Sequence, residues 1–340
     1  MGLLSAVRPG FGVDLGTANT VVYHPTRGVL LNEPSVMIVR PNGDHAPAPV
    51  AVGSQARELV GRTPTGLEAV RPLRDGVITD LVAAKTFITA MLRRVPAQPW
   101  EKLRPRAVIG VPAGATSLER QALLEAADEA DMGRVHLMPE PIAGAVGAGL
   151  DPTVSRAQMV VDVGGGTAEI TAFCFGGVLA SRSSRIAGDE MTAALCSYLR
   201  QEHGVLAGEL TVEAAKTGSG GGRNGSVRVE GRDTATGRPR AVELKGTELA
   251  IALAPTLDAI IEALTGALAD DLPPQAVADI MNDGVVAFGG GSLLRGFGLR
   301  LEEELGFRVR VAEDALICVA RGAAMCLSRP AVLKAFSPPL

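Results

Sequence analysis

The chain is poor in aromatic residues, cysteine and net charge, and each shortage narrows what it can do. Aromatic residues make up 3% of the 340 residues, with a single Trp, so a stacking platform for single-stranded nucleic acid is not expected. The formal net charge of -4 gives no general reason to expect a nucleic-acid partner either. We therefore expect no nucleic acid among the partners of this chain.

Cysteine is scarce and its spacing is uninformative for metal binding. Cys174, Cys196, Cys318 and Cys326 form no CxxC pair and lie inside apolar segments. This pattern favours buried, reduced thiols over a disulfide or zinc framework. We identify no apolar run long enough to span a bilayer, and no leader-like segment opens the chain. These features predict a cytosolic protein.

Two common nucleotide-binding motifs are missing as well. The chain has no GxxxxGK[ST] sequence, and no lysine follows a glycine turn into a helix, which excludes a Walker P-loop. The GGGT segment at Gly164–Thr167 joins two predicted strands rather than a strand and a helix. It is therefore not a dinucleotide-binding fingerprint.

The sequence does contain a repeated device. Gly12–Thr20 reads GVDLGTANT, and Val161–Ile170 reads VDVGGGTAEI. In each segment an apolar strand ends near an aspartate, a glycine-bearing turn with Thr follows, and a second apolar strand begins. A third glycine turn, Phe288–Ser292, follows the predicted strand Val285–Ala287. Three such turns suggest a nucleotide held between two related halves of the molecule.

The aspartates of the two hairpins, Asp14 and Asp162, point to a cation. A carboxylate at the end of a buried strand is costly unless a cation or a hydrogen-bond donor compensates it. Mg²⁺ on a nucleotide supplies such a cation, often through retained waters, and the nearby glycines let backbone N–H groups approach phosphate oxygens. The alternative is a pair of ordinary hairpin turns that use Asp and Gly for their backbone conformation. The repetition favours phosphate binding.

Three further polar residues are candidates for the same site. Glu140, in the sequence MPEP, lies at a predicted helix start between prolines, where a carboxylate can orient a water rigidly. The helix dipole alone also favours an acid there, which is the alternative interpretation. Glu213 and Lys216 share a helix face at i,i+3, and the spacing by itself favours a surface ion pair.

Strand and helix patterns alternate along the chain, which predicts an α/β fold, and the length allows two domains. Helices are expected over Asp80–Val95 and from a capping box at Thr116–Glu119. Thr247–Leu268 is expected to form two helices or one kinked helix because of Pro255. A strand at Arg308–Val311 is expected to close the fold.

Taken together, these features make the chain resemble the MreB/Mbl family, the bacterial actin-like proteins within the actin, sugar-kinase and DnaK-type ATPase superfamily. The resemblance runs from about Phe11 to Cys326, nearly the whole chain. The motifs that carry it are DLGTANT, LNEPSV, GRTP, RPLRDGVITD, VDVGGGTAEI, RIAGDEM and FGGGSLLRG.

The resemblance implies an actin-like ATPase fold with two domains, each with an RNase H-like core, around a central cleft for ATP and Mg²⁺. Domain I would cover residues 1–145, with subdomain IB at about 33–75, and the segment 316–340 would pack back on it. Domain II would cover residues 146–315, with subdomain IIB at about 182–246.

The same resemblance implies roles for individual residues. Asp14 and Asp162 would position the metal, through water, and Glu140 would polarise the attacking water, with no covalent intermediate. The residues implied to contact the nucleotide are Gly16, Thr17, Ala18, Asn19, Gly164, Gly165, Gly166 and Thr167 at the phosphates, Glu213 and Lys216 at the ribose and adenine, and Gly289, Gly290 and Gly291 at the α-phosphate and sugar.

The chain departs from the family pattern at three positions. Pro139 replaces the first of two consecutive glutamates, Ala168 replaces a threonine near the phosphates, and Thr192 stands where an acidic residue usually follows GDEM. These changes concern the hydrolysis rate more than nucleotide binding. We therefore expect a slow ATPase.

Proteins of this family form filaments, and the resemblance implies antiparallel double protofilaments at the cytoplasmic face of the inner membrane. There they would organise cell-wall synthesis together with membrane proteins of morphogenesis. Trp100 and Leu103 lie where the family carries a membrane-inserting loop, although a packed Trp is the alternative. Leu3 and Leu4 could add a weak apolar anchor. The helix with Leu118 matches the region used between protofilaments, with core packing as the alternative.

Three other functions remain open at this stage. A DnaK-like allosteric ATPase would need a substrate-binding domain after Leu340, which the sequence does not include. A small-molecule kinase of the same fold would need a pocket for the phosphate acceptor and a catalytic base. A divergent relative could bind nucleotide and partners without forming filaments.

Overall fold

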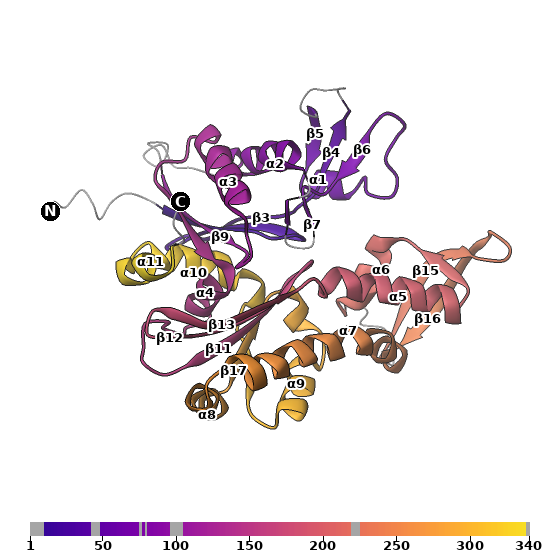
Figure 1. The fold of residues 1–340 in the computed structure, drawn as a ribbon. Helices are drawn as coiled ribbons and strands as arrows, with labels where there is room; N and C mark the ends of the chain where they lie inside the picture. Colours follow the sequence, from indigo (N-terminus) through magenta and orange to yellow (C-terminus); the bar gives the residue numbers. More distant parts are fainter. Residues whose placement is uncertain are drawn as a thin grey trace.

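The computed structural model describes residues 10–41, 48–74, 77–78, 80–95, 105–218 and 225–337. Within these residues, two five-stranded sheets form the centre of the molecule, accompanied by smaller sheets of two or three strands. Figure 1 shows the two large sheets one above the other, with helices between them and on their outer sides. The predicted α/β class is confirmed.

The first large sheet joins an antiparallel meander to two parallel strands. Its strands, in sheet order, are β3 (Gly28–Pro34), β2 (Asn19–His24), β1 (Gly10–Leu15), β9 (Arg106–Val111) and β10 (Val135–Pro139). The strands β1, β2 and β3 are antiparallel neighbours, β9 runs parallel to β1, and β10 runs parallel to β9. The hairpin expected from the first glycine turn is β1–β2.

The second large sheet repeats this arrangement. Its strands, in sheet order, are β13 (Gly177–Ser184), β12 (Ala168–Cys174), β11 (Gln158–Val163), β17 (Val285–Phe288) and β18 (Val309–Val311). The antiparallel and parallel pairings follow the same pattern as in the first sheet. The duplication seen in two hairpins therefore extends to two whole sheets with RNase H-like strand order.

Smaller sheets extend both halves on the side drawn at the right of Figure 1. The first half adds β4 (Met37–Arg40), β5 (Ala48–Val52) and β6 (Glu68–Val70), with the short pair β7 (Leu73–Arg74) and β8 (Val77–Ile78). The second half adds β14 (Val205–Ala207), β15 (Ser226–Asp233) and β16 (Pro239–Lys245).

Helices cover the outer faces of the large sheets and connect the smaller ones. Their bounds are α1 Ser54–Arg57, α2 Leu81–Arg93, α3 Ser117–Glu129, α5 Gly188–Glu202, α6 Glu209–Lys216, α7 Gly246–Gly266, α8 Pro274–Asp283 and α9 Phe297–Leu305, with short turns at Gly290–Leu293 (η3) and Ala315–Ile317 (η4). Asp80 caps α2 by accepting bonds from the N–H groups of Val82 and Ala83. The capping box at the start of α3 is present as predicted.

Two more helices, α4 (Glu140–Gly147) and α10 (Cys318–Cys326), pack together between the large sheets. Their buried residues share one apolar core with Val108 of β9 and Phe288 of β17. Glycines make this contact possible: a Cβ added to Gly322 would lie 1.7 Å from the carbonyl oxygen of Ala143. The two halves are therefore joined by a tightly packed helix pair.

The C-terminal part of the chain differs from the sequence expectation. After β18 the chain continues into α10 and α11 (Pro330–Phe336), whereas a strand was expected to be the last element. Their alternation of small and apolar residues gave no recognisable helix signal. The segment 316–340 was expected to pack on domain I, and α10 does contact β1 and β9, while α11 contacts β10. The predicted domain boundaries stay predictions.

Helix α7 bears on two expectations. It runs unbroken through Pro255, so the expectation of two separate helices is wrong, while a kink stays a prediction. With the π-helical turn Ala267–Asp271 it gives a 26-residue segment long and apolar enough to cross a membrane by length and composition, whereas no such run was expected. In the structure α7 packs on α5, α9 and the second large sheet, and Leu253, Ile260 and Leu264 are buried.

Candidate functional site

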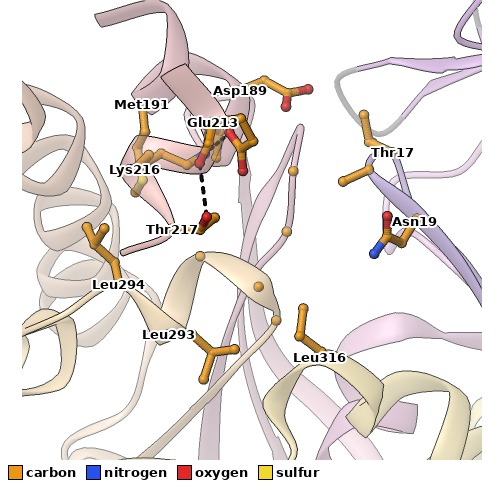
Figure 2. Close-up of a pocket in the computed structure, with 18 of the residues that line it drawn as sticks. Thr17, Asn19, Asp189, Met191, Glu213, Lys216, Thr217, Leu293, Leu294 and Leu316 are labelled. Carbon is orange, nitrogen blue, oxygen red and sulfur yellow. Dashed lines mark hydrogen bonds and ion pairs between the residues drawn. The ribbon is translucent and has the colours of Figure 1, made fainter. Parts of the chain in front are cut away.

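A cavity of about 1160 Å³ lies between the two halves of the molecule. The turns of both hairpins, the third glycine turn and residues of α6 line it, so segments far apart in sequence meet there, as Figure 2 shows. The sequence-predicted residues that line it are Asp14, Gly16, Thr17, Ala18, Asn19, Glu140, Asp162, Gly164, Gly165, Thr167, Glu213, Lys216, Gly289, Gly290 and Gly291. Gly166 is buried and does not line the cavity.

The first hairpin turn is held by a serine of its own half. The N–H of Ser35 donates to the carbonyl of Ala18 at 2.9 Å, and its hydroxyl donates to the carbonyl of Gly16 at 2.6 Å. The same hydroxyl lies 3.0 Å from the hydroxyl of Thr20. These bonds satisfy the turn's carbonyl groups on the side away from the cavity, so the opposite side of the turn faces the cavity.

The second hairpin turn is held by a helix start instead. The N–H groups of Gly188 and Asp189, at the beginning of α5, donate to the carbonyls of Gly164 and Gly165 at 3.2 and 2.7 Å. A Cβ added to Gly165 would lie 2.9 Å from the Cβ of Ala18 in the first turn. The two turns therefore approach each other so closely that glycine is required at this position.

The third glycine turn lies against the aspartate of the second hairpin. Gly289 has a φ of 83°, which favours glycine, and an added Cβ would lie 2.4 Å from Oδ1 of Asp162. Its N–H donates to the carbonyl of Ala315 at 3.0 Å, which ties the turn to the segment before α10. All three turns thus surround one corner of the cavity.

Four carboxyl groups gather beneath these turns. Burial raises the pKa of Asp14 to about 7, and burial raises that of Glu169 to about 7 although the N–H of Ala113 and the hydroxyl of Ser183 oppose the shift. Burial, together with the charges of neighbouring carboxylates, raises the pKa of Glu140 and Asp162 well above the usual range. No cation among the described residues lowers the pKa of Asp14, Glu140 or Asp162.

Glu169 is a member of this group that the sequence analysis missed. It is the register partner of Asp162 across the β11–β12 hairpin, and only 2% of its surface is exposed. Its Oε1 accepts a bond from the N–H of Ala113 at 3.1 Å, in the other half of the molecule. The signal was a lone acid in an otherwise apolar strand, directly opposite an aspartate in an antiparallel pair.

The donor chemistry fits a hard divalent cation held through water. The described residues do not bring three His, Cys, Asp or Glu side chains together as direct metal ligands. Mg²⁺, however, usually keeps several waters and uses one or two carboxylates together with substrate phosphates. A cluster of buried carboxyl groups with raised pKa values is a place where added positive charge is stabilising. Asp14 and Asp162 are therefore suitable outer ligands.

Lys216 and Glu213 form the ion pair expected from their spacing, but not on the surface. The Lys216 Nζ lies 2.7 Å from Glu213 Oε2, and the lysine is buried. The same Nζ donates to the carbonyl of Gly188 at 2.6 Å and to Thr192 Oγ1 at 2.9 Å. The lysine therefore ties α6 to the start of α5, and the expectation of a surface pair is wrong because both helices cover it.

The position of Ala168 also differs from expectation. Its side chain is 1% exposed, belongs to the apolar core of the second half and does not line the cavity. Successive residues of a strand point to opposite faces, so Thr167 faces the cavity while Ala168 faces the core. A hydroxyl at position 168 would therefore start from the core side of this strand, and its expected effect near the phosphates stays a prediction.

An ion pair joins the two halves across the cavity. Arg71 Nη2, beside β7, lies 2.5 Å from Glu209 Oε1 at the start of α6, and both residues line the cavity. Asp189 lies near the same place: burial raises its pKa, while the charges of Arg71 and Lys216 oppose the rise. Arg71 lies within the RPLRDGVITD motif, but local patterns give it no role because its partner is 138 residues away.

The residues proposed for membrane contact, Trp100, Leu103, Leu3 and Leu4, lie outside the described residues. Leu118, at the start of α3, is described and is 60% exposed. Core packing, one of its two interpretations, is therefore wrong for this side chain, because α3 turns Leu123, Ala126 and Ala127 toward the core instead.

Comparisons with known proteins agree with this architecture. The family model for MreB/Mbl protein matches residues 8–335. The cell shape-determining protein MreB of Escherichia coli (strain K12) is 41% identical over 320 residues, which is 93% of this chain and 92% of that protein. The cell shape-determining protein Mbl of Bacillus subtilis (strain 168) is 36% identical over 320 residues, which is 93% of this chain and 95% of that protein.

Solved structures give the same result. MreB5 of Spiroplasma citri bound to AMPPNP superposes with a TM-score of 0.86 at 29% identity, covering 95% of this chain and 97% of that chain. Its ADP-bound structure also has a TM-score of 0.86. A chain of the MamK double helical filament has a TM-score of 0.75 at 24% identity, covering 94% of this chain and 99% of that chain, which speaks for the actin-like fold alone. The chain belongs to the MreB/Mbl family.

Proposed function

We propose that this chain binds ATP with Mg²⁺ in the cavity and that nucleotide state controls its assembly into filaments. The observation that carries the proposal is the close meeting of two glycine turns, at Gly165 and Ala18, beside carboxyl groups that need a counter-charge. MreB5 of Spiroplasma citri, 29% identical, is bound to AMPPNP in one structure and to ADP in another, which supports a nucleotide as the ligand.

The chain's own residues would divide the work as follows. The turns at Gly16–Asn19 and Gly164–Thr167 offer backbone N–H groups and hydroxyls to the phosphates, in the manner of an anion-binding nest. Asp14 and Asp162 hold the waters of the metal, which neutralises phosphate charge when bound. Glu213 and the Gly289–Gly291 turn would contact the ribose, adenine and α-phosphate. Lys216 donates three bonds, so it would support the part of the cavity wall that contains Glu213.

Glu140 is proposed to orient the attacking water. It begins α4 after Pro139, so its backbone position is fixed at the start of a helix. Burial, and after it the neighbouring carboxylates, raise its pKa, so positive charge entering the site would favour the carboxylate form that orients a water. A metal held by Asp14 and Asp162 would supply that charge, and we propose a slow ATPase.

Filament formation is proposed from the family and from one exposed side chain. The chain's relatives are cell shape-determining proteins, and Leu118 presents an apolar side chain to solvent at the start of α3. We propose that this helix lies between antiparallel protofilaments. The filaments would lie on the cytoplasmic face of the inner membrane, where they organise cell-wall synthesis with membrane proteins of morphogenesis.

Sedimentation tests the assembly proposal. Purified protein with Mg²⁺ and ATP should pellet, and Leu118→Glu should pellet several-fold less while binding fluorescent ATP as tightly as wild type. Leu299→Glu, at a leucine that is 70% exposed on α9, is the matched control and should pellet like wild type. Protein that binds ATP but stays in the supernatant under all conditions would favour a non-polymerising nucleotide-binding protein. Phosphorylation of a small molecule would favour a kinase.

Electron microscopy on a lipid monolayer tests the membrane part. Wild type with ATP should form paired filaments on the lipid, and Trp100→Ala should leave filaments in solution while reducing their number on the monolayer. Wild-type filaments that ignore the lipid would contradict membrane association without affecting the assembly proposal.

A further inference from the structure

Three basic side chains gather at one edge of the first large sheet, away from the nucleotide cavity. Arg106 begins β9, and Arg134 and His136 lie at the start of β10. The strands are parallel, with Ala107 opposite Val135 and Val108 opposite His136. Arg106, Arg134 and His136 therefore project from the same face of the sheet, since residues two apart share a face and register partners do too.

Neither arginine of this cluster makes an ion pair in the described part of the chain, and the Nε of Arg106 has no hydrogen-bond partner there. Partial burial and the charges of Arg134 and Arg106 hold the pKa of His136 below its usual value. Arg106 is half-buried and Arg134 is exposed, so the accessible parts of the two guanidinium groups are suited to an acceptor brought by a ligand. A phosphate group supplies several such oxygens.

The place of the cluster in the fold indicates where such a phosphate would come from. Gly10, the first residue of β1, is the register partner of Arg106. The points at which residues 1–9 and residues 96–104 join the described fold therefore lie side by side at this cluster. Both segments contain the residues proposed above for membrane contact. Helix α11, which contacts β10, lies on the side of the molecule away from the α5–α6 lobe (Figure 1).

We propose that Arg106, Arg134 and His136 form a binding site for the phosphate headgroup of an anionic lipid. This inference rests on the proposed membrane association. It deepens that proposal by adding a charged contact with lipid headgroups to the apolar contacts. Basic residues near an anionic surface strengthen binding, and arginine's planar group pairs with phosphate through two parallel bonds. The cluster would thus select and orient the filament surface that faces the lipid.

Vesicle co-sedimentation of the full chain tests this site. Vesicles of phosphatidylcholine alone are compared with vesicles that also contain phosphatidylglycerol, at low and constant ionic strength. The Arg106→Gln/Arg134→Gln variant should lose about fivefold in affinity per arginine for the anionic vesicles, and nothing for the neutral ones. The matched control, Arg62→Gln/Arg200→Gln, removes two exposed arginines elsewhere and should behave as wild type.

Further arms separate the possible outcomes. Arg106→Lys/Arg134→Lys should keep most of the anionic preference, which rules out misfolding as the cause, and thermal melting should match wild type for all variants. An unchanged preference in the Gln variant, or an equal loss in the control, would overturn the site. If millimolar inorganic phosphate abolished vesicle binding by the wild type, the cluster would be a general anion site rather than a site for lipid headgroups. Wild type that binds neither vesicle contradicts membrane association itself, and this inference with it, but not nucleotide binding.

Discussion

The hairpins β1–β2 and β11–β12 are alike in sequence and strand pairing but differ in what holds their turns and in how many acidic residues they carry. The β1–β2 turn is held by Ser35 from its own half, whereas the β11–β12 turn is held by the first N–H groups of α5. Asp14 faces Val21 across its hairpin, while Asp162 faces a second acid, Glu169. A duplicated element has thus kept a turn that lines the cavity and changed the groups that hold it.

This difference has a mechanical consequence. The second turn is connected through α5 and Lys216 to α6, and α6 carries Glu209, which pairs with Arg71 across the cavity. The first turn has no such connection to a distant element among the bonds described for it. A ligand that moves the second turn would therefore act on the α5–α6 lobe, and a ligand on the first turn would act on that lobe only through the contact of Ala18 with Gly165.

The largest effect is expected from removing one carboxylate charge in each hairpin. Asp162→Asn and Asp14→Asn should each lower ATP hydrolysis by about 10- to 100-fold, as for other losses of metal-positioning groups. Both should leave the nucleotide-free protein as stable as wild type or more so, because each relieves repulsion among buried carboxylates. Steady-state phosphate release and thermal melting measure the two effects. Loss of stability together with activity would contradict the assigned role.

A smaller effect is expected where the two turns touch. Gly165→Ala places a Cβ 2.9 Å from that of Ala18 and should weaken ATP binding by about tenfold, because the turns must separate. The double variant Gly165→Ala/Ala18→Gly should recover part of the affinity, since the Cβ of Ala18 is gone while the backbone N of residue 18 stays 3.2 Å from the added Cβ. Titration with fluorescent ATP measures all three proteins. Failure of the second substitution to rescue the first would place the effect in the backbone rather than in this contact.

The smallest effect is a pH dependence of stability to which both hairpins contribute. Asp14 and Glu169 have pKa values of about 7 in the folded protein, above their usual values of 3.8 and 4.5. The folded state then keeps protons that the unfolded chain has lost, so the free energy of unfolding falls as pH rises from about 4 to about 7. Glu169→Gln should flatten this slope in nucleotide-free protein. Melting curves of wild type and Glu169→Gln across this pH range measure the slope. Equal slopes in the two proteins would contradict the prediction.

Local patterns predicted much of the fold and the corners of the site. The hairpins, the α3 capping box and the glycine turns could be recognised because each depends on residues close together in sequence. The family resemblance added the actin-like arrangement of two halves. What local patterns could not give was the pairing of distant elements, such as Arg71 with Glu209 or Glu169 with the N–H of Ala113.

The errors have the same origin. Lys216 was expected at the surface because spacing along one helix says nothing of the helix packed above it. Ala168 was expected beside the phosphates because its strand's facing depends on register, which the turn sequence did not reveal. Pro255 was expected either to divide this segment into two helices or to kink it, and the first alternative is wrong, because α7 continues through the proline while packed on the second sheet.

Calorimetric titration of the purified chain with AMPPNP, with and without Mg²⁺, tests the central claim most directly. The account predicts one site per chain, with affinity at least tenfold higher when Mg²⁺ is present, because the carboxyl groups of Asp14, Glu140 and Asp162 oppose a triphosphate until a cation joins it. Binding that is equally tight with a metal chelator present, or no binding at all, would contradict it.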